Sequence, residues 1–288
     1  MNYSALIQNR KTFREFSDKK VSLSCIKQLR AYYRNSVQRL IPDIKTHLYL
    51  FGADAQPSLE RAAGYQQYLI GAPQYMVLLS QKHEQMHLNA GYIMEDLVLK
   101  LLDMGLDSCY LTFSSSEQIK AALNIISDLD VAAIVAFGRG KKSEKRLQLN
   151  FHSMSDIDMP AKRQYMQPKR SIYDLAFLGT WGNTHRLDEY IGFYDDILWE
   201  ALYAVTLAPS YLNRQAYAFL LRDGSISLIS KPDEYNTPID EKLSLGIALL
   251  HFSAVAQERA ANLHWRFTPD DSSLNLPSGH QLIATSML

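Results

Sequence analysis

The sequence predicts a mixed fold of helices and strands that is built from a repeated unit. Apolar stripes with helical spacing alternate along the chain with short apolar runs of strand length. A helix–strand–strand–helix–strand order occurs in the first part of the chain and recurs in the second. Two long apolar helices open on Gly91 and Gly246, and each leads through a short loop to an aromatic residue, Phe113 and Phe267. The sequence therefore predicts a duplicated chain.

Composition limits the classes of partner. The chain has 288 residues, 47% of them hydrophobic, and its 30 Lys+Arg balance its 30 Asp+Glu. A balanced charge argues against a nucleic-acid partner or an anionic membrane partner. Two cysteines, Cys25 and Cys109, are too few for a disulfide framework. With no signal peptide and no membrane-length apolar run in view, we expect a cytoplasmic protein that acts on small molecules.

The elements of the first half follow from apolar periodicity and breaker residues. The patterns predict, in order, helices over 3–10 and 21–41, strands over 46–52 and 72–80, a long helix from Asn89 that ends at Gly105, and a strand over 132–140. Ser22 or Ser24 caps the second helix. Its expected apolar stripe is Ile26, Leu29, Tyr33, Val37 and Leu40.

The second half repeats this plan after a polar stretch. Residues 140–190 are polar and irregular, which is typical of a connector, and we place the boundary between residues 165 and 166 to give halves 1–165 and 166–288. A helix is expected from Tyr194 to Pro209. A hairpin over 216–230 should turn at Asp223-Gly224, and a long helix follows from Leu243.

Two basic motifs suggest an anion site. In an extended "RKTFR" segment, alternate side chains share a face, so Arg10, Thr12 and Arg14 would point together as a phosphate clamp, with Lys11 beside them. In "FGRGKK", the glycines let the backbone approach a ligand, and Arg139 or Lys141 would complete the site. The competing interpretation of both motifs is a basic, solvent-facing turn.

A third motif suggests zinc. "HEQMH", from His83 to His87, fits the zinc-protease pattern, in which two imidazoles share one helix face and Glu84 would be the base. Polar residues precede the motif, and we expect it to lie in a strand-to-helix loop. We therefore predict no metal site and keep a zinc hydrolase only as a remote alternative.

Six stretches, taken in order, resemble one family. They are "NRKTFREF", "IGAPQYMVLLS", "NAGYIMEDLVLKLLDMGLDSCYLTF", "AIVAFGRGKK", "AVTLAPSYLNRQAYAFLL" and "LGIALLHFSAVAQERAANLHWRF". Together they resemble the FMN-dependent nitroreductase family, in the single-chain branch where two fused halves mimic the usual homodimer. The resemblance implies an α+β three-layer fold with a mixed central sheet flanked by helices, and a monomer that is an internal pseudo-dimer.

The resemblance also implies the cofactor site. Arg10, Lys11, Thr12 and Arg14 would contact the FMN phosphate, the ribityl chain and the pyrimidine edge, with Thr12 where the family commonly has serine. Backbone amides of "CYLTF" would approach the flavin N5 and O4 atoms. The expected cofactor-binding residues are Arg10, Lys11, Thr12, Arg14, Leu111, Thr112, Arg139, Pro209, Ser210 and Asn213.

The two parts of this site each occur once. The basic motif lies only in the first half and "APSYLN" only in the second, while the corresponding first-half stretch reads "YRNSVQRLIPD". The resemblance thus implies one FMN per chain, and hydride transfer from NAD(P)H through flavin N5 to a nitroaromatic, quinone or similar acceptor. No catalytic side chain is expected. The alternative is an FMN-binding protein without robust reductase activity.

Overall fold

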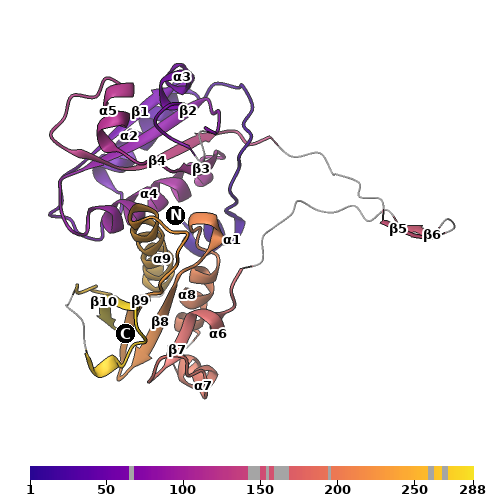
Figure 1. Cartoon of the computed structure of the whole chain (residues 1–288), viewed down its shortest axis with the longest axis vertical. Coiled ribbons are helices and arrows are strands. Elements are labelled where there is room, and N and C mark those ends of the chain that lie inside the picture. Colours follow the sequence, from indigo (N-terminus) through magenta and orange to yellow (C-terminus); the bar gives the residue numbers. More distant parts are fainter. Residues whose placement is uncertain are drawn as a thin grey trace.

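Two four-stranded sheets form the two ends of the molecule, with helices between them (Figure 1). The computed structural model describes residues 1–64, 68–141, 150–153, 156–158, 169–193, 196–258, 263–267 and 272–288. The first half contains α1 (Tyr3–Asn9), α2 (Leu23–Asn35), β1 (Thr46–Gly52), η1 (Ala53–Ala55), α3 (Gln56–Leu59), β2 (Gln74–Ser80), α4 (Met86–Asp103), β3 (Asp107–Leu111), α5 (Ser116–Ala122) and β4 (Asp130–Gly138). Its sheet has the order β1-β2-β4-β3, with every neighbouring pair antiparallel.

The second half is built around α9. It contains α6 (Ile172–Leu175), β7 (Ala176–Leu178), α7 (Leu187–Gly192), α8 (Ile197–Thr206), η2 (Tyr211–Asn213), β8 (Tyr217–Arg222), β9 (Ser225–Ser230), α9 (Pro238–Glu258), η3 (Ser272–Leu274) and β10 (Gln281–Met287). Its sheet has the order β10-β9-β8-β7. The pair β7–β8 is parallel, so this sheet is mixed.

Three strands of each sheet share one topology, which confirms the duplicated plan. The antiparallel pairs β1–β2 and β2–β4 correspond to β8–β9 and β9–β10. The place of β3, beside β4, is taken in the second half by an antiparallel bridge between Arg266 and Thr285. The fold is therefore α+β with two half-units in one chain, and each half carries its own sheet.

The helices α4 and α9 lie side by side at the centre of the molecule (Figure 1). A Cβ added to Gly91 would collide with the backbone of Leu243, and one added to Gly246 would collide with the backbone of Leu88. Each leucine stands three positions before the glycine of its own helix. Such reciprocal contacts are typical of a two-fold interface. A pseudo-two-fold axis thus passes between α4 and α9.

Several local predictions are confirmed. Ser22 caps α2 by accepting the N–H of Cys25. Gly105 follows the end of α4 with φ +73°, as a glycine at C′ does. Asp223 and Gly224 both have positive φ and join the strand residues Arg222 and Ser225. This is the backbone that a two-residue hairpin turn of type I′ requires.

Two predictions are wrong. Helix α2 ends at Asn35, so Val37 and Leu40 lie beyond it, because the chain there bonds elsewhere: the Gln38 N–H donates to the Asp96 carboxylate at 2.8 Å. The stretch 140–190 is more than a connector. Besides α6, β7 and α7 it contains β5 (Asn150–Ser153) and β6 (Asp156–Asp158), which pair antiparallel. The boundary expected at residues 165 and 166 lies outside the described residues.

The described helices also bear on membrane association. None of them combines the length and the apolarity that crossing a membrane requires.

Candidate functional site

The two basic motifs lie side by side at one edge of the first sheet. Thr12 forms a parallel bridge with Ser108 at the start of β3, and the Phe13 N–H donates to the Ser108 carbonyl at 3.1 Å. The Ser17 N–H donates to the Arg139 carbonyl at 2.8 Å, and the Lys141 N–H donates to the Glu15 carbonyl at 2.9 Å. Residues 122 and 126 positions apart are therefore joined by backbone hydrogen bonds.

This contact depends on a glycine. A Cβ on Gly140 would collide with the ring of Phe13. Gly140, the second glycine of "FGRGKK", therefore lets the basic segment pack closely onto the end of β4. The Lys11, Arg14 and Arg139 side chains remain exposed.

Arg10 differs from the other cations because its side chain is only 8% exposed. Its Nη1 donates to Thr12 Oγ1 at 3.4 Å, so these two side chains share a face as predicted. Its Nε lies 3.7 Å from Glu95 Oε1 and, among the described residues, has no hydrogen-bond partner. Arg10 is therefore a buried cation that makes an ion pair with Glu95, and a guanidinium is a candidate group for binding an anion.

Glu95 is the counter-ion beneath Arg10. It is fully buried on α4, where it receives the Tyr110 hydroxyl at 2.9 Å and faces His251 Nε2 at 3.0 Å. Burial alone would raise the pKa of Glu95. The His251 hydrogen bond, the Arg10 charge and the Tyr110 hydroxyl outweigh it, so this pKa lies below its usual 4.5. Glu95 is thus an anion at neutral pH.

The "APSYLN" segment follows α8 and has a strained backbone. Leu212, Asn213 and Gln215 all have positive φ, between 46° and 57°. The buried Gln215 holds the segment: its N–H donates to Ser210 Oγ at 2.9 Å, and its Nε2 donates to the Thr206 carbonyl at 2.8 Å. Strain of this kind concentrates at ligand sites. Pro209 is buried, whereas Ser210 and Asn213 are half-buried.

Lys169 is a site residue that the sequence prediction missed. Its Nζ donates to the Ala208 carbonyl at 3.0 Å. Burial, and after it the Arg10 charge, lower the pKa of Lys169 to about 8. Lys169 also lines a pocket of about 370 Å³, together with Arg170, Asp174, Leu212, Asn213 and Arg214. Because it lies in a polar stretch predicted to be a connector, no local pattern marked it.

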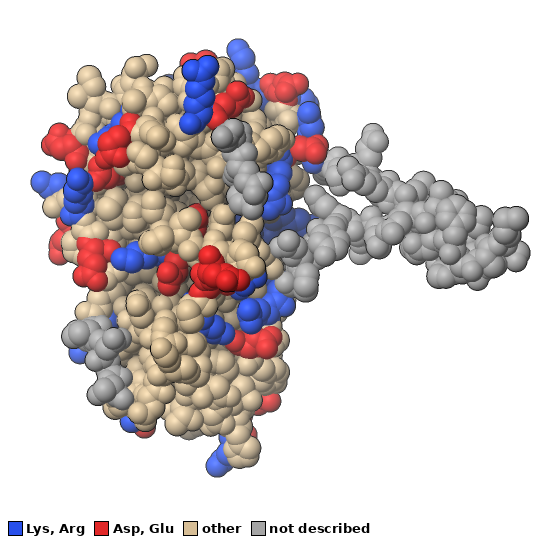
Figure 2. All heavy atoms as spheres, viewed as in Figure 1, with Lys and Arg blue, Asp and Glu red and all other residues tan. Residues whose placement is uncertain are grey.

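The charged residues that form this site come from both halves of the chain. Figure 2 shows lysine and arginine side chains gathered along the right-hand edge of the molecule, at the level where the halves meet. Arg10, Lys169 and Ala208 are thereby brought together. The basic segment and the start of "APSYLN" therefore lie close together in the structure.

The predicted residues at the end of β3 contact other residues of the first half. Leu111 is a buried residue paired with Ile134, and Thr112 Oγ1 donates to the Gly64 carbonyl at 3.1 Å. The Thr112 hydroxyl is thus engaged within the first half. Burial raises the pKa of the neighbouring Cys109 thiol to about 11, so this thiol is not a nucleophile at neutral pH.

The position related to this site by the pseudo-two-fold axis is occupied by side chains. The Ile41 N–H donates to Asn89 Oδ1 at 3.0 Å, as the Tyr211 N–H donates to Ser244 Oγ at 3.2 Å. Asn89 and Ser244 each stand two positions before the central glycine of their helix. The stretch "YRNSVQRLIPD" is therefore the structural counterpart of "APSYLN".

A polar network fills that counterpart position. The Asp96 carboxylate receives the hydroxyls of Tyr3 and Tyr32 at 2.8 and 2.9 Å, and the Gln38 N–H. Burial raises the pKa of Asp96 despite these hydrogen bonds. No arginine or lysine takes part in these hydrogen bonds, so they bring no positive charge to this position.

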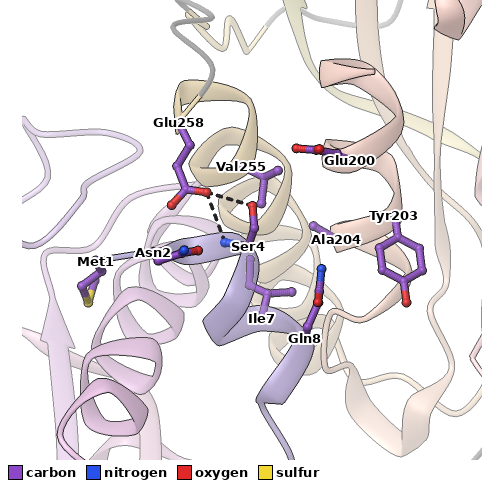
Figure 3. Close-up of a pocket in the computed structure, with 10 residues that line it drawn as sticks. All are labelled: Met1, Asn2, Ser4, Ile7, Gln8, Glu200, Tyr203, Ala204, Val255 and Glu258. Carbon is purple, nitrogen blue, oxygen red and sulfur yellow. Dashed lines mark hydrogen bonds between the residues drawn. The ribbon is translucent and has the colours of Figure 1, made fainter. Parts of the chain in front are cut away.

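A larger pocket, of about 570 Å³, lies between α1, α8 and α9 (Figure 3). Its charged side chains are both carboxylates, Glu200 and Glu258, and Glu258 accepts a hydrogen bond from the Ser4 hydroxyl at 2.8 Å. None of the predicted cofactor residues lines it. Carboxylates repel a phosphate, so we do not assign the anion site to this pocket.

The zinc motif does not form one helix face. Helix α4 begins at Met86, so His83 and Glu84 precede it. His83 Nδ1 accepts the Gln85 N–H, and His87 Nδ1 faces the Ala132 carbonyl at 3.2 Å. Within the described ranges, no three His, Cys, Asp or Glu side chains converge as metal ligands.

Comparison with solved structures places the fold. A crystal structure of a "putative nitroreductase" from Thermotoga maritima matches all of this chain and 94% of its own, with a TM-score of 0.57 and 19% identity. An FMN-dependent nitroreductase from Clostridium difficile matches 50% of this chain and 90% of its own at a TM-score of 0.42 and 15% identity. Iodotyrosine deiodinase bound to FMN and 3-iodo-L-tyrosine matches 53% of this chain and 97% of its own, with a TM-score of 0.42 and 16% identity.

Comparison with protein families gives the assignment. No curated protein matches the chain. The family model described as "Putative TM nitroreductase" matches residues 2–173, which include α1, the basic segment and the whole first sheet. That match spans more than half of the chain, and the chain therefore belongs to this nitroreductase family.

Proposed function

We propose that this protein is an FMN-dependent oxidoreductase that binds one FMN where the basic segment meets "APSYLN". The observation that carries the proposal is Arg10, a buried cation whose Nε has no hydrogen-bond partner among the described residues. Arg10 lies between the halves, with Glu95 of α4 on one side and the Lys169 charge nearby. A phosphate-bearing ligand would add negative charge beside this guanidinium.

The residues present fit such a ligand. Arg10, Thr12 and Arg14 offer two guanidiniums and a hydroxyl from one segment, and Arg139 is fixed beside them by the Ser17 hydrogen bond. Paired arginine donors match the geometry of phosphate oxygens. Lys169 adds a cation from the second half. We assign these five residues to anion binding, with Lys11 contributing charge from the side.

Pro209, Ser210 and Asn213 would form the wall of the site from the second half. Backbone amides of Leu111 and Thr112 would lie toward the ring of the ligand, since backbone donors stabilise developing negative charge. Bound FMN would supply the redox chemistry, taking hydride from NAD(P)H and passing it to a nitroaromatic, quinone or similar acceptor. The side chains bind and orient the reactants, and no residue is assigned as an acid or a base.

The first experiment measures cofactor and donor together. The purified protein should be yellow and release FMN, and under anaerobic stopped flow the bound flavin should lose its absorbance on mixing with NADH or NADPH. Flavin that binds but is bleached by neither donor would indicate an FMN-binding protein without reductase activity. A protein that cannot bind FMN would overturn the proposal.

A variant pair tests the assigned residues. Arg10→Ala combined with Arg14→Ala should release FMN with at least about a hundredfold loss of affinity, since charge-assisted hydrogen bonds contribute about 1.5–3 kcal/mol each. Circular dichroism and the melting temperature should show that the fold is retained. Arg186→Ala is the matched control, because Arg186 is an exposed arginine that pairs with Glu189. Flavin retained by the double variant would contradict the assignment.

A further inference from the structure

A buried pair of titratable side chains joins the two halves beneath Arg10. Glu95 comes from α4 and His251 from α9, and both are fully buried. His251 Nε2 lies 3.0 Å from Glu95 Oε1, and its Nδ1 lies 2.9 Å from the Ala204 carbonyl. Neither residue belongs to the cofactor set proposed above.

The hydrogen-bond partners of His251 fix how many protons the Glu95–His251 pair holds. A carbonyl oxygen only accepts, so Nδ1 must carry a proton to bond with Ala204. The Nε2–Glu95 hydrogen bond then needs a second proton, which lies either on His251 or on the carboxyl group. The pair therefore holds one proton more than a neutral imidazole and a carboxylate would.

The surroundings decide where this proton resides. Arg10 lies 3.7 Å from Glu95, and the Tyr110 hydroxyl donates to its second oxygen at 2.9 Å. Both contacts stabilise the carboxylate form of Glu95 over its protonated form. The charged or titratable groups that act on the pair from neighbouring elements are Arg10, Tyr110, Lys169 and Tyr217.

The pair occurs on one side of the pseudo-two-fold axis only. Glu95 stands four positions after Gly91, and the residue four positions after Gly246 is Leu250. His251 and Asp96 each stand five positions after their glycine. The buried carboxylate–imidazole pair is thus found beneath the basic segment and is absent from its counterpart position, where Asp96 is held by tyrosine hydroxyls. This placement links the pair to the anion site rather than to helix packing in general.

We propose that Glu95 and His251 form an imidazolium–carboxylate pair that holds Arg10 in position for anion binding. Without the pair's proton, Glu95 loses its bond to α9, and the carboxylate is no longer fixed beneath the guanidinium. The link to flavin affinity rests on the proposed function, whereas the protonation state of His251 does not. Both residues act through Arg10 and are positioning residues.

Nuclear magnetic resonance of ¹⁵N-histidine-labelled protein without flavin tests the proton directly. At pH 7, one of the 8 histidines should show both ring nitrogens protonated, and His251→Asn should remove that signal. In Glu95→Gln, the side-chain amide can donate to Nε2, so the same ring should become singly protonated. His87→Asn is the matched control: His87 also lies on a long helix with Nδ1 facing a carbonyl, and its loss should leave the signal in place.

Flavin titration tests the positioning role. Glu95→Gln and His251→Asn should each weaken FMN binding by about tenfold or more, and the double variant should be no weaker than the worse single variant, because the two residues act as one unit. His87→Asn should bind as the wild type does. A singly protonated His251 in the wild type at pH 7 would overturn the proposal whether or not flavin binds. Unchanged or tighter FMN binding in Glu95→Gln would overturn the positioning role. Wild-type protein that binds no FMN would instead refute the proposed function.

Discussion

Arg10 shows why a chain of zero net charge concentrates cations near its start. Its guanidinium is buried against one carboxylate, Glu95, while the Lys169 charge lies in the same neighbourhood. Burying more positive than negative charge is costly unless an anion completes the set. The cluster as folded is thus short of negative charge, and an anionic ligand would supply it.

Lys169 gives this site a pH dependence. An anion bound beside Lys169 favours its protonated form and raises its pKa above the value of about 8 in the free protein. FMN affinity should therefore be highest below pH 8 and fall as the pH rises above it. Fluorescence titrations between pH 6.5 and about 9.5 would measure this decline.

Two substitutions at Lys169 separate charge from geometry. Lys169→Arg keeps its charge across this range and should bind FMN with a flat pH profile. Lys169→Gln should bind weakly at every pH. An unchanged decline above pH 8 in Lys169→Gln would show that another group is responsible.

At the scale of elements, α4 and α9 decide how the halves join. Their closest approach is at Gly91 and Gly246, where each glycine faces the partner helix's backbone without a Cβ. Gly91→Ala or Gly246→Ala should lower the free energy of unfolding by at least about 2 kcal/mol, since the backbone cannot yield as a side chain would. Gly192→Ala, at a helical position with open space around it, is the control and should be neutral. Urea denaturation would measure the free energy of unfolding of each variant. An equal loss in Gly192→Ala and in the two central variants would contradict the close approach.

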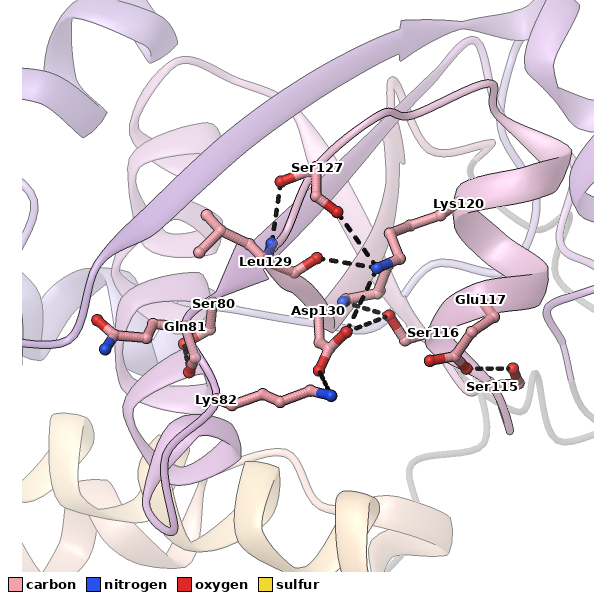
Figure 4. Close-up of polar contacts among 11 residues, drawn as sticks. Ser80, Gln81, Lys82, Ser115, Ser116, Glu117, Lys120, Ser127, Leu129 and Asp130 are labelled. Atoms are coloured by element: carbon pink, nitrogen blue, oxygen red, sulfur yellow. Dashed lines mark hydrogen bonds and ion pairs between the residues drawn. The ribbon is translucent and has the colours of Figure 1, made fainter.

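The turn between α5 and β4 has a polar anchor (Figure 4). Lys120 Nζ donates to the Ser127 and Leu129 carbonyls at 3.4 and 3.2 Å, and it pairs with Asp130 at 3.4 Å. Lys120→Met should lower the free energy of unfolding by about 1–2 kcal/mol because these half-buried acceptors lose their donor.

The control for this anchor is Lys82, which also pairs with Asp130, at 3.6 Å, but has a side chain that is 80% exposed. Lys82→Met should change the free energy of unfolding by less than about 0.5 kcal/mol, as exposed ion pairs contribute little. Thermal melts of the two variants would compare them. A larger loss in Lys82→Met would place the stabilisation in the ion pair rather than in the carbonyl contacts.

At the scale of the whole molecule, a duplicated architecture carries an asymmetric chemistry. The strand order, the central glycines and the loop hydrogen bonds to Asn89 and Ser244 obey the pseudo-two-fold axis. The basic segment, the Glu95–His251 pair and "APSYLN" do not. A duplicated scaffold can lose one of two equivalent sites while keeping the packing that both halves need.

One FMN per chain is the resulting prediction. Tyr3, Tyr32 and Asp96 fill the counterpart position, and none of the three is a cation. Absorbance of released flavin against protein concentration, with calorimetric titration of the apoprotein, should give a ratio near one. A ratio near two would show that the counterpart position also binds flavin.

The sequence by itself determined the longer helices, several strands, the duplication and the basic segment. Strand 46–52 and the hairpin turn at Asp223-Gly224 were predictable because side-chain alternation and turn chemistry are properties of neighbouring residues. The end of α2 at Asn35 was not predictable, since bonds to the distant Asp96 and Asn89 draw the following loop away from the helix.

Only the tertiary structure decided how the site is assembled. Glu95 and His251 are 156 positions apart, and Lys169 lies in a stretch with no periodic pattern. Their roles arise from burial and from their closeness to Arg10. Both arise only when α4 and α9 pack together. A local pattern records what each residue prefers, whereas the protonation of a buried group depends on everything that surrounds it in the fold.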